Sequence, residues 1–472
     1  MRNKSAYLWG LFARFAPSFI LLASNMVLAR FVSPDDFGII GSLAIIFNVA
    51  NMLIDAGLGG SLIKEVVLKE EDCSTIFIFN FICSLVCFAI VFCAASPIGS
   101  ALGIIGNVDI IRLLSFSLIL SALCVVPRAL IIRELNFKAN FIIGLFSNLA
   151  SSIIAIIIAI LGFGIYSLVV NQLASVLLQF ILSLYYSKYR FSFAFSLSSF
   201  KKLAPFGVYS SLNSIVNTIY ENSITSITGK YVNMSQAGYL SQAKRLNDAL
   251  SYSVAMTIGS VTFPVVTRLK EDTEKFNNEI RQIYKVIPLF VFPVLMAVAA
   301  LSDEVVVVLF GDQWLPAGIY LSILMFAGIF IVLEALFNGF IQATGNISSL
   351  TLITFVKRSI GVGILFCFAL WVNNSIIYGY LISSFIGFIF SFLLFCRQLK
   401  CSAKSYIIHS LWSIIPSILI YVIITTIKQT WDVNSFALFF VSFIILMLYY
   451  LVVLRIVGIN VITTIRNIIK RK

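Results

Sequence analysis

The chain has 472 residues, of which 60% are hydrophobic and only 11% are charged. A soluble protein is about half apolar and about one quarter charged, so this composition excludes a soluble globular protein. The formal net charge of +13 would suit a nucleic-acid-binding protein, but the basic residues lie mainly in short segments between long apolar runs, and no nucleic acid is expected as a partner. The sequence therefore predicts an integral membrane protein.

The apolar runs predict an all-α integral membrane protein with about fourteen transmembrane helices. Each run is long and continuously apolar, whereas the strands of a membrane β-barrel are short and alternate in polarity. The first run starts near Tyr7, and its length favours a retained helix over a cleaved signal peptide. In chain order, the predicted spans cover about 7–30, 37–63, 75–98, 109–132, 139–162, 164–187, 204–228, 236–267, 285–310, 315–342, 348–372, 376–396, 406–427 and 435–455.

Lysine and arginine are unequally shared between the two sides of these spans. When the N-terminus is placed in the cytoplasm, most loop cations fall on the cytoplasmic side. The bias predicts an even number of spans, both termini in the cytoplasm, and contact between the basic loops and anionic membrane lipids. The tail at 458–472 is expected to be a basic amphipathic helix at the cytoplasmic interface, or a simple positive anchor.

An internal repeat of about 200 residues divides the chain. Arg30–Ile39 (RFVSPDDFGI) matches Lys230–Tyr239 (KYVNMSQAGY), and two weaker matches follow in the same order. Duplication of a six-helix unit in parallel orientation places the pathway between the two copies. The predicted divisions are an N-lobe at 1–190, a C-lobe at 200–400, two further helices at 401–457 and the tail at 458–472.

Five cations lie inside or at the edges of apolar spans, where a lysine or arginine costs about 2.5–3.5 kcal/mol. They are Arg14, Lys244, Arg245, Lys357 and Arg358. We interpret them as the wall of a cationic cavity that binds an anionic cargo. Asp248 lies one turn after Lys244 and Arg245, so an intrahelical ion pair is an alternative for one of the two. For the other three, the alternative is snorkelling toward an interface.

Four acidic residues are embedded as well, and they are expected either to carry a coupling ion or to pair with the cations. They are Asp55, Glu221, Asp248 and Glu334. Polar residues recur on matching faces of both copies, with Asn48, Asn51 and Asp55 on the second span. A single histidine, His409, and eight cysteines without a CxxC pair predict no metal site, no disulfide and no cofactor.

Several stretches resemble the polysaccharide transporter branch of the multidrug/oligosaccharidyl-lipid/polysaccharide (MOP) exporter superfamily, the Wzx-type flippases of bacterial surface polysaccharides. They are Leu28–Gly38 followed by Asp55–Gly59, Arg133–Lys138 and Phe310–Trp314. The resemblance implies two six-helix lobes around a cationic cavity that works by alternating access. It implies that the cargo, an undecaprenyl-diphosphate-linked oligosaccharide for O-antigen, capsule or exopolysaccharide, moves from the cytoplasmic to the periplasmic leaflet. A polysaccharide polymerase of the same pathway is a candidate partner.

Three other classes of membrane protein fit the sequence less well. A small-molecule cation antiporter of the multidrug branch shares the architecture, but carboxylates would dominate its cavity, whereas the embedded cations outweigh the acids here. An enzyme of the same pathway would need catalytic carboxylates or arginines on a large loop, and the longest loops are short and basic, so no catalytic residue is expected. A channel suits two duplicated bundles less well, because such bundles favour rocking between two states.

Overall fold

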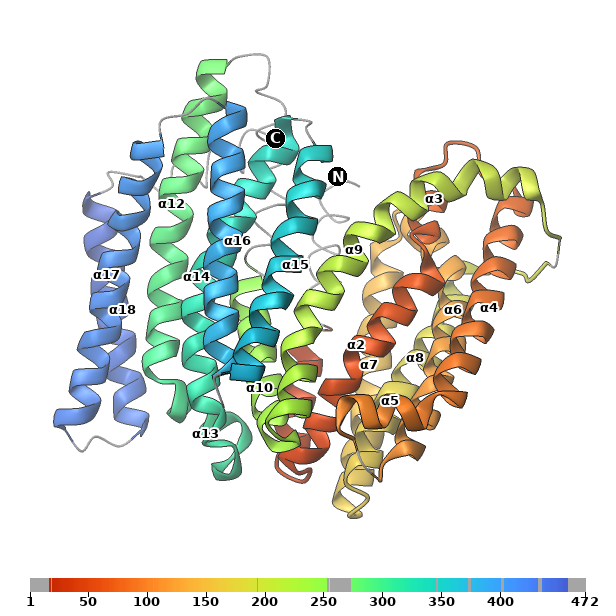
Figure 1. Ribbon diagram of the computed structural model, residues 1–472, viewed down its shortest axis with the longest axis horizontal. Helices are drawn as coiled ribbons and strands as arrows, with labels where there is room; N and C mark the ends of the chain where they lie inside the picture. Colours follow the sequence, from red (N-terminus) through yellow and green to blue (C-terminus); the bar gives the residue numbers. More distant parts are fainter. Residues whose placement is uncertain are drawn as a thin grey trace. The chain divides into compact units, whose positions relative to one another are not determined.

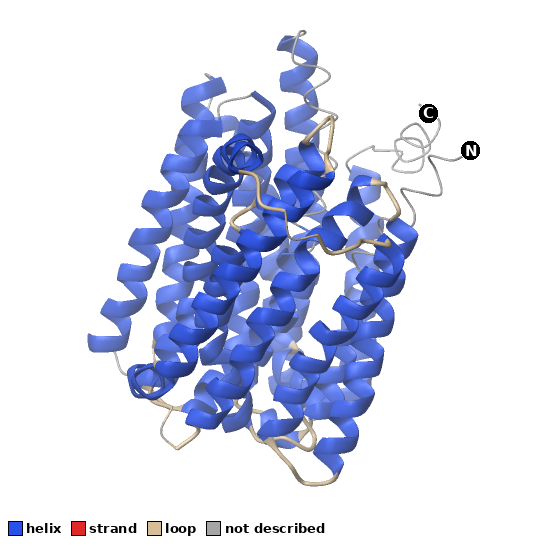
Figure 2. Ribbon diagram, turned by 90° about the vertical axis from the view of Figure 1, so that its right-hand side faces the viewer, coloured by secondary structure: helices blue, strands red, loops and turns tan. Residues whose placement is uncertain are grey.

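The computed structural model describes residues 17, 19–104, 106–192, 194–252, 254, 273–344, 347–371, 375–399, 403–431 and 435–456. Arg14 and the tail at 458–472 lie outside this part of the chain. Every regular element among the described residues is a helix (Figure 2). Eleven of these helices are long and apolar enough to cross a bilayer. The prediction of an all-α, multi-pass membrane protein is therefore confirmed for the described residues.

Contacts divide the chain into two compact units. Unit 1 comprises Met1–Arg245, Leu309–Trp314 and Thr354–Gly379. Unit 2 comprises Leu246–Val308, Leu315–Ile353 and Tyr380–Lys472.

The described part of unit 1 begins with an apolar helix and continues through helices that include α2 to α8, on the right in Figure 1. Ser33 caps the second of these helices, since its Oγ accepts a hydrogen bond from the Asp36 amide at 3.2 Å, and Pro34 occupies the first turn. The helices are Phe19–Leu28, α2 (Pro34–Asp55), α3 (Leu58–Lys64), α4 (Glu70–Cys93), α5 (Ala95–Leu102), α6 (Val108–Arg133), α7 (Phe137–Ile160), α8 (Ile165–Ser187), α9 (Leu197–Tyr231) and most of α10 (Met234–Asn247) and α15 (Ile347–Trp371).

The second predicted span, at 37–63, is not continuous. Ala56 and Gly57 both have left-handed backbones, with φ of 44° and 67°, and they separate α2 from α3. The break lies against α9, where a Cβ on Gly57 would be 2.5 Å from the Gly207 carbonyl oxygen. Glycine allows both the left-handed turn and this backbone contact, which apolar length alone does not reveal. The third predicted span is also divided, at Ala94 between α4 and α5, but the backbone there is not left-handed.

Helices α2 and α9 run antiparallel and are in contact along much of their length (Figure 1). The Ser226 hydroxyl donates to the Ser42 carbonyl at 2.8 Å, and the Asn48 amide donates to Asn222 Oδ1 at 3.2 Å. Small residues let two membrane helices approach closely enough for such bonds to form. Helix α2 contains the second predicted span and α9 the seventh. Their pairing therefore links the two copies of the predicted repeat.

Two of the stretches that carry the family resemblance meet around Trp314, at the end of a 3₁₀ turn (η2, Asp312–Trp314). The Trp314 side chain is fully buried, and its Nε1 donates to the Ala29 carbonyl at 2.7 Å. Its ring packs edge-on against Phe37 and Tyr239, with centroids 5.3 and 5.8 Å away. Edge-to-face packing at these distances is favourable, so the turn stabilises the N-terminal ends of α2 and α10.

Unit 2 is built around α12, which contacts α14, α17 and α18. An aromatic cluster fills its interior, where Phe337 stacks on Tyr284 at 5.1 Å and packs against Phe395 at 4.8 Å. The helices of this unit are the π-helix η1 (Asp248–Tyr252), α12 (Thr273–Ala300), most of α13 (Ser302–Phe310), α14 (Ala317–Thr344), most of α16 (Ile376–Leu399), α17 (Ala403–Thr430) and α18 (Ser435–Ile456).

Candidate functional site

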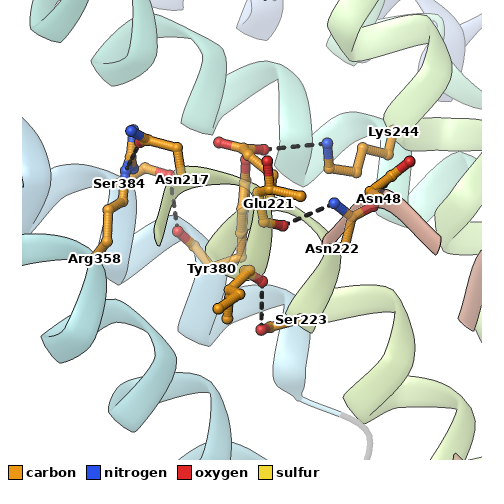
Figure 3. Close-up of polar contacts among 11 residues, drawn as sticks. Asn48, Asn217, Glu221, Asn222, Ser223, Lys244, Arg358, Tyr380 and Ser384 are labelled. Carbon is orange, nitrogen blue, oxygen red and sulfur yellow. Dashed lines mark hydrogen bonds and ion pairs between the residues drawn. The ribbon is translucent and has the colours of Figure 1, made fainter. Parts of the chain in front are cut away.

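Two of the predicted residues form an ion pair inside unit 1. The Lys244 Nζ on α10 lies 3.1 Å from the Glu221 carboxylate on α9 (Figure 3). The two side chains are only 15% and 30% exposed, so water screens the pair weakly. Glu221 thereby compensates the charge of Lys244. The asparagine pair Asn48–Asn222 lies beside it in Figure 3, because Asn222 follows Glu221 on α9.

Arg358 on α15 is held by the same face of α9. Its Nε donates to Asn217 Oδ1 at 3.0 Å, and its guanidinium carbon lies 4.4 Å from the centre of the Tyr220 ring. Tyr220 is 1% exposed, so the ring is a fixed surface under the guanidinium. These two contacts fix the orientation of the planar guanidinium, a group that can bind a phosphate through parallel N–H donors.

Asn217 and Glu221 are one helical turn apart on α9, which explains how one helix serves both cations. Figure 3 shows Asn217 beside Arg358 and Glu221 beside Lys244. The arrangement therefore places two cations and one carboxylate next to side-chain amides. Such a combination can bind an anionic group and the hydroxyl groups attached to it.

The remaining predicted cations have different surroundings. Lys357 precedes Arg358 on α15 and is only 2% exposed, so protein encloses its side chain, which is not the arrangement that snorkelling would give. Arg245 is half-buried on α10. Arg14 lies outside the described residues.

The remaining predicted acids belong to different units. Asp248 and Glu334 belong to unit 2, where Glu334 is 4% exposed and a Cβ on Gly387 would approach its carboxylate to 2.9 Å. Asp55 belongs to unit 1 and ends α2, where its Oδ1 accepts a hydrogen bond from the Gly59 amide at 3.0 Å. Asp55 is therefore placed by the turn between α2 and α3.

Asp55 also lines a cavity of about 350 Å³ that α2, α3 and α6 enclose within unit 1. Asn51 lines the same cavity, and its Oδ1 is buried without a hydrogen-bond partner among the described residues. Arg128 contributes a cation to the wall and donates to Gln179 Oε1 at 3.3 Å. The cavity thus combines a carboxylate, an amide oxygen and a guanidinium.

Sequence reasoning missed four residues of these two sites. The sequence analysis predicts no role for Asn217, Tyr220 and Asn222, nor for Arg128, which lies within α6. A signal for Asn217 was present, because it stands four residues before Glu221 inside an apolar span. Nothing in the sequence distinguishes Tyr220 from an ordinary core aromatic residue.

The amino-acid sequence of the chain matches a known protein family. Residues 27–319, more than half of the chain, match the family described as polysaccharide biosynthesis protein. The chain belongs to this family. The matched region includes α2, α9 and α10, which carry most of the polar contacts described above.

Two curated bacterial proteins are similar to the chain in sequence. The chain is 27% identical to the succinoglycan biosynthesis transport protein ExoT of Rhizobium meliloti, over 63% of this chain and 60% of that protein. It is 24% identical to the lipopolysaccharide biosynthesis protein WzxC of Escherichia coli K12, over 62% of this chain and 60% of that protein. In both cases the alignment spans less than two thirds of the relative's length. The predicted membership of the polysaccharide transporter branch is confirmed.

Two solved structures show the same fold. The lipid II flippase MurJ in an inward closed conformation superimposes with a TM-score of 0.77, covering 97% of this chain and 100% of that chain, at 16% identity. An inward-facing multidrug resistance MATE family transporter of the MOP superfamily superimposes with a TM-score of 0.62, covering 90% and 99%, at 15% identity. At these identities the likeness establishes the fold of the superfamily alone.

Proposed function

We propose that this protein is a flippase that moves an undecaprenyl-diphosphate-linked oligosaccharide from the cytoplasmic to the periplasmic leaflet for surface polysaccharide biosynthesis. Membership of the polysaccharide biosynthesis protein family supports a transporter of this class. The observation that carries the cargo assignment is Arg358, whose guanidinium is oriented by Asn217 and by the ring of Tyr220. An oriented guanidinium can bind a phosphate group through two parallel hydrogen bonds.

The proposed binding mode divides the cargo between two kinds of side chain. Arg358 would bind the diphosphate, while the amides of Asn48 and Asn222 would bind sugar hydroxyls on the same side of α9. Glu221 would compete with the diphosphate for Lys244, because an incoming anion attracts Lys244 and repels Glu221. The remaining proposed cavity cations are Arg14, Arg245 and Lys357.

We propose fourteen transmembrane helices. Eleven described helices meet the length and hydropathy requirements, and the three further spans would be Phe19–Leu28, α9 and α10. Helix α9 carries Asn217, Glu221 and Asn222, and α10 carries Lys244, and polar residues within spans are expected to face a wet cavity. Under this proposal, spans 1–6 form the N-lobe at 1–190 and spans 7–12 the C-lobe at 200–400, and the last two spans at 401–457 precede the tail at 458–472.

The same proposal places the protein in the bacterial inner membrane with both termini in the cytoplasm, next to a polysaccharide polymerase that uses the translocated cargo. It assigns no catalytic step to the chain. A multidrug-type cation antiporter is disfavoured, because a cation-binding cavity needs an available carboxylate, and Glu221 is paired with Lys244.

The test is complementation of a strain that lacks the gene, with surface polysaccharide measured by immunoblotting and the cytoplasmic lipid-linked intermediate measured by extraction. Arg358→Ala should abolish surface polysaccharide and cause the intermediate to accumulate, since the diphosphate loses its oriented donors. Arg358→Lys should restore little, because an ammonium keeps the charge but not the planar fork.

The matched control is Arg112→Ala, which removes an arginine whose ion pair with Asp109 is exposed on α6. It should support wild-type levels of polysaccharide. Normal export by Arg358→Ala at wild-type protein abundance would refute the cargo assignment. Increased drug sensitivity of the deletion strain with unchanged polysaccharide would instead favour the antiporter.

A further inference from the structure

A second cavity, of about 460 Å³, lies within unit 2 among α12, α17 and α18. Figure 1 shows these three helices side by side, and α12 contacts both of the others. The volume of the cavity falls in the range of sites that bind small molecules. Its lining residues are Lys285, Leu289, Ile408, His409, Trp412, Pro416, Tyr449, Val452 and Val453.

One end of this cavity is basic. Lys285 on α12 and His409 on α17 both line it, and Arg281, one turn before Lys285, acts electrostatically on His409 together with Lys285. Arg455 follows at the end of α18, within one turn of the lining residue Val452. Among the described residues that line the cavity, none is acidic. An anion is therefore attracted to this end.

The rest of the cavity is apolar and aromatic. Leu289, Trp412 and Pro416 form one wall, and Val452 and Val453 of α18 contribute to the other. A free inorganic anion would leave this surface uncovered, whereas an acyl chain would fill it. The cavity therefore suits an amphiphile with an anionic group at one end.

Tyr449 supplies a second, independent indication of a ligand. Its hydroxyl is buried and has no hydrogen-bond partner among the described residues, although it belongs to the cavity wall. The neighbouring Tyr450 is satisfied, since its hydroxyl donates to the Phe290 carbonyl at 2.7 Å. Buried hydroxyl groups are nearly always hydrogen-bonded, so a ligand oxygen is the expected acceptor for Tyr449.

We propose that this cavity binds one anionic glycerophospholipid of the surrounding bilayer. The phosphodiester contacts Lys285 and His409, an ester oxygen accepts from Tyr449, and an acyl chain lies against Trp412 and Pro416. The single negative charge of a phosphodiester matches one lysine and a nearby histidine, and basic pockets between membrane helices are known to hold such headgroups. The site is independent of the cargo site proposed for unit 1.

Fluorescence quenching tests the proposal, because Trp412 lines the cavity. The purified full-length protein is reconstituted with phospholipid whose acyl chains carry bromine, either phosphatidylglycerol or phosphatidylcholine. We expect brominated phosphatidylglycerol to quench more strongly at equal mole fraction, and Trp412→Phe, which retains the other four tryptophans, to remove the difference. Lys285→Gln should reduce the preference for phosphatidylglycerol by about fivefold, as expected for one cation near the membrane surface.

The matched control is Lys404→Gln, which removes one positive charge from α17 at an exposed position outside the cavity. It should keep the preference. Tyr449→Phe removes no charge and should weaken quenching by phosphatidylglycerol, which tests the hydroxyl even where a charge change harms folding. Equal quenching by both lipids, or equal effects of Lys285→Gln and Lys404→Gln, would overturn the proposal. Displacement by undecaprenyl phosphate in preference to unlabelled phosphatidylglycerol would also overturn it.

Discussion

Gly38 and Gly238 lie where the backbones of α2 and α10 touch. A Cβ on Gly38 would be 1.9 Å from the Met234 carbonyl oxygen, and a Cβ on Gly238 would be 1.9 Å from that of Pro34. These neighbours are backbone atoms, which cannot move aside as the end of a side chain can. Any side chain at either position must therefore push the two helices apart.

Gly238→Ala should lower the free energy of unfolding by about 1–3 kcal/mol, the usual effect of overpacking. The measurement is the melting temperature of the purified protein in detergent, followed by fluorescence-detected size exclusion. Gly363→Ala on α15 is the control, since a Cβ there meets nothing within 4 Å and the change favours helix. Equal melting temperatures for the two variants would contradict the close contact.

The site residues show what a single sequence reveals at this scale and what it does not. Lys244, Glu221 and Arg358 were found because charges inside apolar spans are costly and therefore conspicuous. The partner of Lys244 was not foreseeable, because Asp248 is nearer in sequence while Glu221 is brought to it by the packing of α9 against α10. Asn217 and Tyr220 became relevant only when α15 was placed beside α9.

At the scale of elements, α3 depends on an arginine from another helix. Arg133, the last residue of α6, donates to the carbonyls of Leu62, Glu65 and Val66, with the Leu62 contact at 2.8 Å and the Val66 contact at 3.1 Å. The last carbonyls of a helix have no partner within it, and a cation there also interacts well with the helix dipole. The seven-residue helix α3 is too short to be stable alone.

Arg133→Ala should therefore destabilise α3 locally by about 1.5–3 kcal/mol, the range for hydrogen bonds to a charged group. Hydrogen exchange measured by mass spectrometry should show faster exchange in peptides covering 58–68, with little change elsewhere. Arg112→Ala on the same helix α6 is the control, because its exposed ion pair contributes little. Unchanged exchange at 58–68 would show that α3 is held by other contacts.

The predicted spans coincide well with the observed helices where the chain is uniformly apolar, as in α6, α7 and α8. They differ where tertiary contact decides the backbone. The break at Ala56 and Gly57 depends on the backbone of Gly207, which is 150 residues away in sequence. Helices α9 and α10 are less apolar than the other spans, because their polar faces meet one another and α2.

At the scale of the whole molecule, residues that the predicted repeat makes equivalent contact one another. The Ser235 hydroxyl donates to the Asp35 carboxylate at 2.7 Å, and these residues are 200 positions apart. Gly38 and Gly238, which make mutual backbone contacts, have the same separation. If the two copies rock during transport, as alternating access requires, this contact must open in each cycle.

Cysteines at Asp35 and Ser235, introduced into a background without the eight native cysteines, should be joined by a short bifunctional thiol reagent. The joined protein should support less than one tenth of wild-type surface polysaccharide, and a reducible reagent should allow recovery on reduction. The control is Ser235→Cys alone, treated with the same reagent, since a single thiol on α10 ties no two helices together. Full export by the joined Asp35–Ser235 variant would show that this contact stays closed throughout.

The meeting of residue i with residue i+200 bears on how such a chain arose. In a symmetric dimer, positions near the twofold axis touch their own copies in the other subunit. Asp35 with Ser235, and Gly38 with Gly238, retain that self-facing pattern within one polypeptide. A six-helix ancestor that paired with itself before its gene was doubled and fused would leave this trace.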